Sequence, residues 1–372
     1  MSSPVPGSMG NSRLPKGPGQ PLAVPWPPYR GRAMSLRGTL FADLPERSRQ
    51  LLRACPQPEW IAPMLATLTQ RRFSDPDWIF ERKLDGERCL AFCSGRRVRL
   101  LSRNRLRLGG TYPEIVDVLE SGRDHDVVID GEVVAFEDGR TSFSRLQKRM
   151  GVTDPDAARR SGVAIFYYVF DLLHLDGYEV TRLPLRDRKA LLRRAVRYRA
   201  PVRFTLHRNR EGEAYFADAC RRGWEGLIAK RAGSSYASRR SPDWLKFRCS
   251  NQQELVVGGF TDPSGTRVGL GALLLGYYED NRLVYAGKVG TGFDVATLRS
   301  LRQRLGELEQ ARSPFAGSRT IGERGVHWVK PQLVAEVAFT EWTTDGLLRH
   351  PRYLGLRRDK PAREVVRERT GR

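Results

Sequence analysis

The chain has 372 residues and a mass of 42.2 kDa, a length that predicts two domains. No run of 18 apolar residues occurs and the N-terminus has no apolar signal core, so we expect neither a membrane span nor secretion. The 64 basic residues outnumber the 42 acidic ones, and the net charge of +22 favours a polyanionic partner, with nucleic acid ahead of an anionic membrane surface. Five scattered cysteines without a Cys-x-x-Cys pair argue against a disulfide framework or a zinc ribbon.

The first 55 residues have the composition of an unfolded segment. Residues 1–35 contain eight Pro and five Gly and few large apolar side chains. Such a segment cannot bury enough surface to offset its loss of conformational entropy. We therefore predict a disordered basic arm over residues 1–55, with one short helix at 44–54.

Residues 56–250 alternate between strand and helix patterns. Runs rich in Val, Ile, Phe and Tyr, separated by Gly, Asp and Ser, predict strands at 78–94, 98–102, 127–136 and 164–173. Helical patterns between the strands lie at 112–119, 143–149, 186–198 and 213–222. The fold class is therefore α+β, and we expect mainly antiparallel strands.

Residues 251–372 show a second pattern. Short strands are predicted at 254–260, 271–278, 283–289 and 335–342, with a helix at 295–309. Several short strands with one helix in about 120 residues are typical of a small Greek-key barrel of the OB type.

The lysines indicate where chemistry could take place. Only nine of the 64 basic residues are Lys and the other 55 are Arg, which cannot give up a proton and act as an amine nucleophile. Lys83 follows an apolar strand and precedes an Asp85-Gly86 turn. A lysine at such a junction can be held against an apolar wall, where desolvation exposes the neutral amine. A plain surface hairpin would give the same octapeptide pattern.

The rest of the chain distinguishes a nucleophilic lysine from a plain surface hairpin, because seven short motifs follow one another in a fixed order. They are Lys83-Leu84-Asp85-Gly86-Glu87-Arg88, Ser102-Arg103-Asn104, Asp130-Gly131-Glu132, Phe170-Asp171-Leu172-Leu173, Glu225-Gly226-Leu227-Ile228-Ala229-Lys230, Trp244-Leu245-Lys246-Phe247-Arg248 and Arg357-Arg358-Asp359-Lys360. The series resembles that of the covalent nucleotidyltransferases, which include ATP-dependent DNA ligases, RNA ligases and mRNA capping enzymes. The first motif alone is weak, whereas seven in this order are specific.

Over residues 58–368 the chain looks most similar to the ligase domain of the bacterial end-joining ligase D family. The phrases at 61–66, 256–269, 349–352 and 354–360 carry this similarity. The resemblance implies an adenylation domain at 56–250 and an OB domain at 251–372. It implies ATP and Mg²⁺ or Mn²⁺ as cofactors and nicked or broken duplex DNA as substrate. It also implies a monomer in the bacterial cytoplasm, associated with the nucleoid, with a Ku-like end-binding protein as a candidate partner.

The resemblance gives the cationic residues their expected roles. Lys83 attacks the α-phosphorus of ATP and forms lysyl–AMP. Lys230, Lys246 and Arg248 neutralise the phosphates during this in-line displacement. Arg248 departs from the pattern, because many relatives have Lys there. Lys16, Lys148 and Lys189, which lie outside the motifs, are expected to be solvated.

Three carboxylates are the expected metal ligands, because hard divalent cations prefer oxygen donors. They are Asp85, Glu132 and Glu225. Glu132 and Glu225 could instead contact the ribose hydroxyls, and Asp85 could be a local turn residue. Without its motif, Glu132 would be read as a solvated strand residue.

The remaining roles concern nucleotide and DNA binding. Phe170 resembles the aromatic residue that stacks on adenine, although its apolar run would also suit a core residue. Glu81 stands where the family contacts the base edge, and Arg88 and Arg103 resemble residues that grip the ribose and the 5′-phosphate of the break. In the last motif, Asp359 and Lys360 resemble the residues that swing over ATP and orient pyrophosphate.

Two other classes of function remain open at this point. The chain could be an RNA ligase, a guanylyltransferase or another covalent nucleotidyltransferase, or it could be a non-catalytic module that binds DNA ends. NAD⁺ as the AMP donor is disfavoured, because nothing in the sequence matches the nicotinamide-binding module or the cysteine-rich zinc element of NAD⁺-type ligases.

Overall fold

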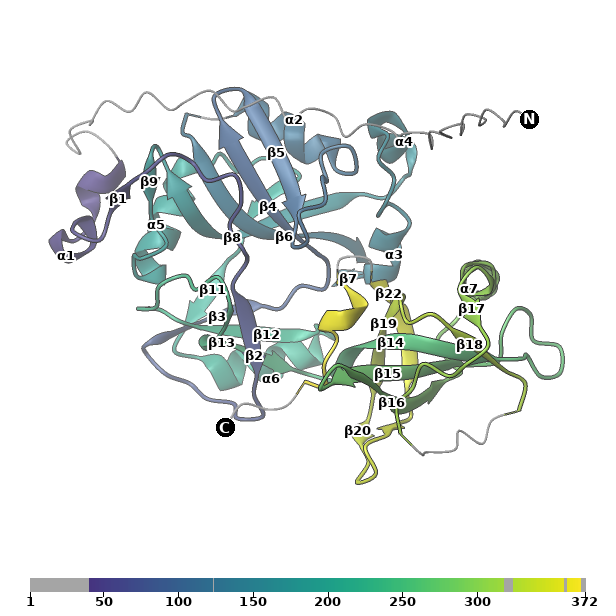
Figure 1. Cartoon of the computed structure of the whole chain (residues 1–372). Helices are drawn as coiled ribbons and strands as arrows, with labels where there is room; N and C mark the ends of the chain where they lie inside the picture. The colour runs from purple at the N-terminus through teal and green to yellow at the C-terminus, as the bar shows by residue number, and fades with distance from the viewer. Residues whose placement is uncertain (1–39, 123, 318–323, 358–359, 369–372) are drawn as a thin grey trace, which may run out of the picture. The chain divides into compact units, whose positions relative to one another are not determined.

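A computed structural model describes residues 40–122, 124–317, 324–357 and 360–368 (Figure 1). The predicted arm up to residue 39 and Asp359 lie outside these residues. None of the helices in this part of the chain has the length and apolar character needed to span a membrane.

The chain joins the first domain earlier than the predicted boundary at residue 55. A 3₁₀ helix, Leu40–Asp43, brings Phe41 into the core, where 1% of its surface is exposed. The helix predicted at 44–54 is a single turn, α1 (Glu46–Arg49), and β1 (Arg53–Ala54) then pairs with β9 (Tyr178–Glu179). The Pro- and Gly-rich composition of the preceding residues concealed this short apolar anchor.

The largest sheet of the first domain has the strand order β1-β9-β8-β6-β4-β5. Its strands are β4 (Glu87–Ser94), β5 (Arg97–Ser102), β6 (Val127–Glu137) and β8 (Ile165–Leu175), with β7 (Arg140–Thr141) and β10 (Val202–Phe204) at its margins. In β4, Cys89 and Ala91 face one core while Leu90 and Phe92 face another. Because neighbouring side chains point to opposite faces of a strand, both faces of this sheet are buried.

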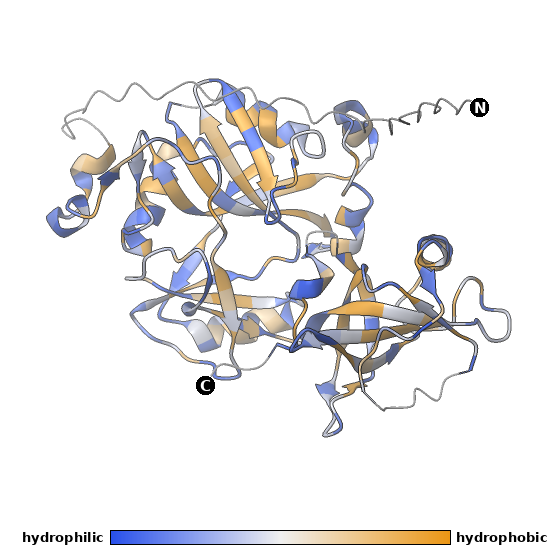
Figure 2. Ribbon diagram, viewed as in Figure 1, coloured by the Kyte–Doolittle hydropathy of each residue, from blue (hydrophilic) through white to orange (hydrophobic). Residues whose placement is uncertain are grey.

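Five helices accompany this sheet and its neighbour. They are α2 (Pro113–Ser121), α3 (Phe143–Gln147), α4 (Pro155–Arg160), α5 (Leu185–Ala195) and α6 (Gly212–Arg221). Helix α4 begins where the Asp154 side chain accepts a hydrogen bond from the backbone N–H of Ala157, and Pro155 occupies the first helical position. The hydropathy colouring shows strongly apolar strands in the large sheet, as two buried faces require (Figure 2).

The second sheet has the order β11-β3-β12-β13-β2. Its strands are β2 (Leu65–Leu68), β3 (Trp78–Arg82), β11 (His207–Asn209), β12 (Gly226–Arg231) and β13 (Arg240–Arg248). One disulfide joins Cys220 in α6 to Cys249 after β13. The cysteine spacing gave no sign of this link, because the two residues are 29 positions apart and meet only in the folded chain.

The segment that carries Lys83 is a crossover between these sheets and not the hairpin that its sequence suggested. Strand β3 pairs with β11 and β12, whereas β4 pairs with β5 and β6. The chain passes from one sheet to the other at Lys83–Gly86. A Cβ atom at Gly86 would lie 2.1 Å from the Val133 carbonyl oxygen, so only glycine allows this close crossing.

The barrel domain follows at Asn251. Strands β14 (Asn251–Thr261), β15 (Leu273–Glu279), β16 (Arg282–Val289), β17 (Glu309–Gln310), β18 (Val326–Val329), β19 (Val334–Phe339) and β22 (Arg352–Arg357) form one antiparallel sheet, beside the β20 (Glu341–Trp342) and β21 (Leu348–Arg349) hairpin. Strand β14 shifts register after Val257 and pairs with β19 before the shift and with β18 after it. Helix α7 (Val295–Gly306) separates β16 from β17, and a second 3₁₀ turn lies at Ala362–Glu364.

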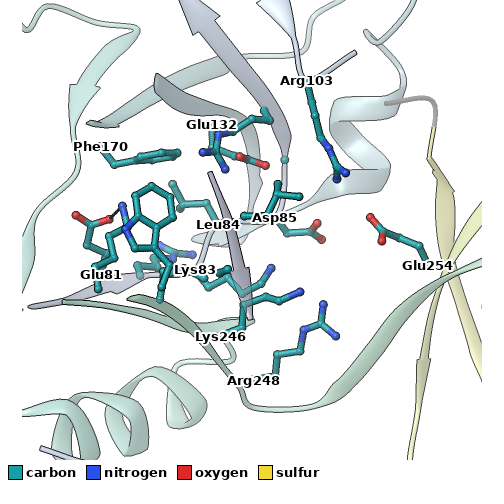
Figure 3. A pocket seen from close by; sticks show the side chains of 18 of the residues that line it. Glu81, Lys83, Leu84, Asp85, Arg103, Glu132, Phe170, Lys246, Arg248 and Glu254 are labelled. Atoms are coloured by element: carbon teal, nitrogen blue, oxygen red, sulfur yellow. Dashed lines mark ion pairs between the residues drawn. The ribbon is translucent and has the colours of Figure 1, made fainter. Parts of the chain in front are cut away.

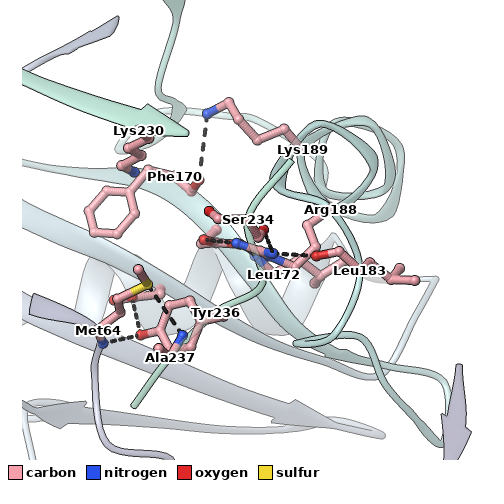
Figure 4. Close-up of polar contacts among 12 residues, drawn as sticks. Met64, Phe170, Leu172, Leu183, Arg188, Lys189, Lys230, Ser234, Tyr236 and Ala237 are labelled. Atoms are coloured by element: carbon pink, nitrogen blue, oxygen red, sulfur yellow. Dashed lines mark hydrogen bonds and ion pairs between the residues drawn. The ribbon is translucent and has the colours of Figure 1, made fainter. Parts of the chain in front are cut away.

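A buried ion pair holds the strand that carries Phe170 (Figure 4). The Arg188 guanidinium of α5 donates hydrogen bonds of 2.7 and 3.0 Å to Asp171, and both side chains have no exposed surface. Arg188 also donates to the carbonyl oxygens of Leu183 and Ser234. The pair therefore ties β8 to α5 and to the loop after β12.

We predict that Arg188→Met lowers the free energy of unfolding by about 3–5 kcal/mol, because Asp171 would be left charged and buried without its partner. The double variant Arg188→Met/Asp171→Leu should recover most of the loss. Urea denaturation followed by circular dichroism measures both. A single-variant loss below about 1 kcal/mol, the range of an exposed pair, would contradict the assignment.

Candidate active site

A cavity of about 200 Å³ lies between the two sheets of the first domain and is also lined by side chains of the barrel domain (Figure 3). The residues predicted from sequence that line it are Glu81, Lys83, Asp85, Arg88, Arg103, Glu132, Phe170, Lys230, Lys246, Arg248 and Lys360. Glu225 reaches the same place through its ion pair with Lys83. The fold thus brings together motifs that are separated by up to 277 positions in the sequence.

Lys83 stands at the crossover between the sheets. Its backbone N–H donates a 2.9 Å hydrogen bond to the carbonyl oxygen of Gly226, which places the side chain beside Glu225. The Lys83 amine and the Glu225 carboxylate form an ion pair whose side chains are 15% and 4% exposed. Burial lowers the pKa of Lys83, but the pairing with Glu225 outweighs burial, so the pKa lies above its ordinary value. The amine is therefore protonated in the resting protein.

Asp85 lies two residues further along the crossover, in an acidic part of the cavity. Burial, followed by the charges of Glu336 and Glu225, raises the pKa of Asp85 well above its ordinary value. Arg357 is 3.6 Å away and offsets this effect only in part. The raised pKa of Asp85 therefore reflects its burial first and the neighbouring carboxylates second.

Lys246 and Arg248 extend from β13 into the cavity. They are two positions apart, so they share one face of the strand. Burial lowers the pKa of Lys246 to about 8. Both cations contact Glu368: the Lys246 Nζ lies 2.6 Å from Oε1, and the Arg248 Nη1 lies 2.8 Å from Oε2.

Lys230 lies at an aromatic end of the cavity and not beside Lys246 and Arg248. Its Nζ is 4.2 Å from the centre of the Phe170 ring and 4.0 Å from that of Trp244, and it is 2.6 Å from Glu81. The Lys230 side chain is 2% exposed. This environment differs from the predicted phosphate contact and favours a role at the base end of a nucleotide.

Glu81 is buried between two lysines. Its Oε1 accepts a 2.5 Å hydrogen bond from Lys189, and its Oε2 pairs with Lys230. Burial raises the pKa of Glu81, but the two lysines outweigh it and hold the pKa below its ordinary value. The prediction that Lys189 is solvated is wrong, because 4% of its side chain is exposed and its Nζ contacts the Phe170 carbonyl oxygen at 3.5 Å (Figure 4).

The two arginines that were predicted to bind the ribose and the 5′-phosphate are paired with carboxylates of the protein in this structure. Arg88 donates two 2.5 Å hydrogen bonds to Asp130, and its guanidinium lies 4.7 Å from the centre of the Phe170 ring. Arg103 donates a 3.0 Å hydrogen bond to Glu364 of the barrel domain and keeps 23% of its side chain exposed. Arg103 is therefore the more accessible of the two.

The barrel domain contributes residues that sequence reasoning missed. Glu254 on β14 and Glu336 on β19 are direct partners across the sheet, and both line the cavity. Each is paired with a cation of the last motif: Lys360 lies 2.5 Å from Glu254, and Arg357 lies 3.0 Å from Glu336. These cations lower the pKa of Glu254 to about 2, although burial opposes the shift. A glutamate inside an otherwise apolar strand, β19, is the sequence signal that could have identified Glu336. Glu254 follows the polar residues 251–253 and carries no such signal.

The three predicted metal ligands do not form a ready-made cluster. Within the described residues, no three His, Cys, Asp or Glu side chains lie close enough together to hold a metal ion. Glu132 faces Arg88 across the β4–β6 register, whereas Asp85 and Glu225 lie near Lys83. Glu132 is thus held on β6, whereas Asp85 lies on the crossover and Glu225 immediately precedes β12.

Two family models match the chain. The ATP-dependent DNA ligase domain matches residues 63–248, and the ATP-dependent DNA ligase C-terminal region matches residues 266–360. The chain is also similar to the multifunctional non-homologous end joining protein LigD of Pseudomonas aeruginosa, with 40% identity over 321 residues, which is 84% of this chain and 37% of that protein. The LigD protein of Mycobacterium tuberculosis is 38% identical over 315 residues, covering 83% of this chain and 40% of that protein. The chain thus spans about two fifths of the length of these relatives.

A solved structure, mycobacterial DNA ligase D complexed with ATP and MES, is 36% identical and aligns with a TM-score of 0.60 over 83% of this chain and 98% of that one. This match confirms the predicted fold of a nucleotidyltransferase domain followed by an OB-type barrel. Together, the motif order, the fold and these matches show that the chain belongs to the ATP-dependent DNA ligase family.

Proposed function

We propose that the protein seals breaks in duplex DNA that carry a 3′-hydroxyl and a 5′-phosphate, using ATP and a lysyl–AMP intermediate on Lys83. The observation that carries this proposal is the environment of the Lys83 amine. It lies in one cavity with a carboxylate partner, Glu225, with the cations Lys246 and Arg248, and with an aromatic pocket at Phe170. Such a cavity can hold a nucleotide by its base and its phosphates and present a nucleophile between them.

In the first step, the neutral Lys83 amine attacks the α-phosphorus of ATP. The nitrogen–phosphorus bond forms as the bond to the bridging oxygen breaks, and pyrophosphate leaves with the electron pair. The amine must first lose a proton, and the Glu225 carboxylate is in contact with it and placed to receive that proton. Lys246 and Arg248 stabilise the charge that develops on the phosphates.

The base end of the nucleotide would lie at the aromatic part of the cavity. The centre of the Phe170 ring lies 4.7 Å from the Arg88 guanidinium and 4.2 Å from the Lys230 ammonium, and the ring meets Trp244 edge to face at 6.0 Å. The buried Glu81 beside Lys230 offers a fixed polar group to the edge of the base. This arrangement gives Lys230 and Lys189 a positioning role for Glu81.

The barrel domain would serve the first step and then leave. Arg357 and Lys360 line the cavity now, so they can add positive charge around the pyrophosphate. In the later steps AMP passes from Lys83 to the 5′-phosphate, and the 3′-hydroxyl then attacks and expels AMP. DNA has to reach Lys83 for these steps, so the barrel domain must move away from the cavity.

The residues fit a hard divalent cation in part. The Glu225 carboxylate is buried, and its Oε2 atom has no hydrogen-bond partner within the described residues. Asp85 lies near two further carboxylates, Glu336 and Glu225, whose charges add to burial in raising its pKa. Bound Mg²⁺ or Mn²⁺, held by Asp85, Glu225 and the phosphates of ATP, would supply positive charge to the reacting phosphate and compete with Lys83 for Glu225.

The finer features of the substrate and partners are also proposals. Two of the relatives are named as end-joining proteins, which supports double-strand breaks as one substrate. The excess of 22 positive charges suits contacts with phosphates, and sequence preference should be slight. The monomeric state, the Ku-like partner and the association with the nucleoid stay predictions.

We predict that Lys83→Arg abolishes adenylation and nick sealing while leaving the fold intact. Arginine retains the positive charge beside Glu225 but offers no free amine. Incubation with ATP and Mg²⁺, followed by intact-mass measurement and by sealing of a 5′-phosphorylated nick, tests both parts. A stable AMP adduct on the variant would remove Lys83 as nucleophile. Wild-type protein that binds nicked DNA but never forms an adduct would instead support a non-catalytic end-binding module.

We predict that Glu225→Gln and Asp85→Asn each reduce adenylation at millimolar Mg²⁺ roughly 100-fold and raise the Mg²⁺ concentration needed for half-maximal rate. Glu341→Gln, which removes one carboxylate from an exposed pair with Arg349, is the matched control and should leave both unchanged. Normal Mg²⁺ dependence in both site variants would exclude these two carboxylates from the metal site.

We predict that affinity for ATP falls as the pH rises above about 8. The pKa of Lys246 lies at about 8, so its side chain is a charged ammonium below that pH and a neutral amine above it. The loss of this charge should lower the affinity for ATP by up to tenfold per pH unit. Calorimetric titration of Lys83→Arg with ATP between pH 7 and 9.5 measures the slope. Adding Lys246→Arg should flatten the slope, because arginine stays charged throughout. Equal slopes in the two proteins would show that Lys246 does not bind ATP through its charge.

A further inference from the structure

The last described residues, which we call the tail (Val365–Glu368), turn back from the barrel domain into the cavity. Val365 is fully buried, and its carbonyl oxygen accepts a 2.7 Å hydrogen bond from the Tyr278 N–H on β15. Gln253 on β14 donates to the Val366 carbonyl oxygen at 3.2 Å and accepts from the Glu368 N–H at 3.1 Å. The tail is therefore held along its length by the barrel domain.

The last residue of the tail, Glu368, has a side-chain carboxylate that bridges two cations of the first domain. The Glu368 oxygens lie 2.6 Å from Lys246 Nζ and 2.8 Å from Arg248 Nη1, and 12% of the side chain is exposed. Burial raises the pKa of Glu368, but the two cations outweigh burial and hold it far below its ordinary value. The Glu368 carboxylate is therefore charged at neutral pH.

This carboxylate resembles a phosphate in what it offers the two cations. It presents two anionic oxygens, one to each cation, as two non-bridging oxygens of a phosphate would. Even with Glu368 in place, burial and then the charges of Arg248 and Lys83 lower the pKa of Lys246 to about 8. An ATP phosphate and the Glu368 carboxylate cannot both occupy the position between Lys246 and Arg248.

We propose that Glu368 is a built-in substitute for a nucleotide phosphate, which neutralises Lys246 and Arg248 when the cavity is empty and which ATP must displace. This inference rests on the proposed function, because it takes Lys246 and Arg248 as phosphate ligands. Displacement detaches the tail of the barrel domain from the first domain, so nucleotide binding is coupled to the position of the barrel domain.

Equilibrium binding separates this competition from a structural role. We compare Lys83→Arg with Lys83→Arg/Glu368→Gln, so that no covalent step takes place, and titrate each with adenosine, AMP and ATP in a calorimeter. Removing the competing charge should tighten ATP binding by roughly tenfold, as expected if about one molecule in ten has its phosphate site open in the parent. Adenosine affinity should not change, because Glu368 contacts no residue of the aromatic end of the cavity in the described structure.

Two further variants complete the test. Lys83→Arg/Glu341→Gln removes the same charge from the exposed pair with Arg349 and should leave the ratio of ATP to adenosine affinity unchanged. Glu368→Asp retains the charge but is one methylene shorter, so it cannot bridge both cations and should tighten ATP binding by a smaller factor. In the enzyme with Lys83 intact, Glu368→Gln should lower the KM for ATP more than it changes kcat for adenylation.

Several results would overturn the inference. One is an unchanged or weaker affinity for ATP in Glu368→Gln. Another is an equal change in the affinities for adenosine and ATP. Either result would show that Glu368 is only a structural link. Lys83→Arg/Lys246→Met distinguishes this failure from failure of the proposed function. If that variant loses ATP affinity while Glu368→Gln has no effect, only the competition is wrong. If ATP affinity is indifferent to Lys246, the phosphate site itself is wrong.

Discussion

The buried positive charge of the cavity is the constraint on which the rest of the structure depends. A ligase of this kind needs several cations around a small volume, yet an unpaired buried charge costs several kcal/mol. The chain meets this cost with carboxylates: Glu225 pairs with Lys83, and Glu368 pairs with Lys246 and Arg248. The barrel domain adds further acid–base pairs from its own strands. Each of these cations therefore has an anionic partner before any nucleotide is bound.

The same arrangement explains why two domains are needed. The proposed nucleophile, Lys83, and Lys246 lie in the first domain, whereas Arg357, Lys360 and Glu368 come from the barrel domain. In the proposed cycle, nucleotide phosphates would replace carboxylates as partners of the cations, and the contacts that hold the barrel domain over the cavity would change with them. Arg103, which contacts Glu364 across the same boundary, would then be available to a DNA phosphate once the barrel domain moves. The proposal thus links chemistry and domain motion through one set of charges.

The motif order predicted much of the fold and of the site, because short motifs record local structure and the residues that touch the nucleotide. It placed Lys83, Phe170 and Lys246 in one cavity before any coordinates. It could not show that Lys83 lies on a crossover between two sheets, because strand pairing is a long-range property. It was wrong about the exposure of Lys189, and it gave no sign that Lys189 and Lys230 share the partner Glu81, which is 108 and 149 positions away in the sequence. Glu368 has no motif at all, and its role depends on where the tail returns.

Among the described residues, four lysines line the cavity, and each is paired with a carboxylate: Lys83 with Glu225, Lys230 with Glu81, Lys246 with Glu368 and Lys360 with Glu254. The proposed function depends on Lys83 being the one that attacks phosphorus. The most direct measurement is peptide mapping by tandem mass spectrometry of the wild-type protein after incubation with ATP and Mg²⁺. The account predicts a single AMP on the peptide that contains Lys83, which disappears when nicked duplex DNA is added. AMP on the peptide of Lys230 or Lys246, or an adduct that nicked DNA does not discharge, would contradict it.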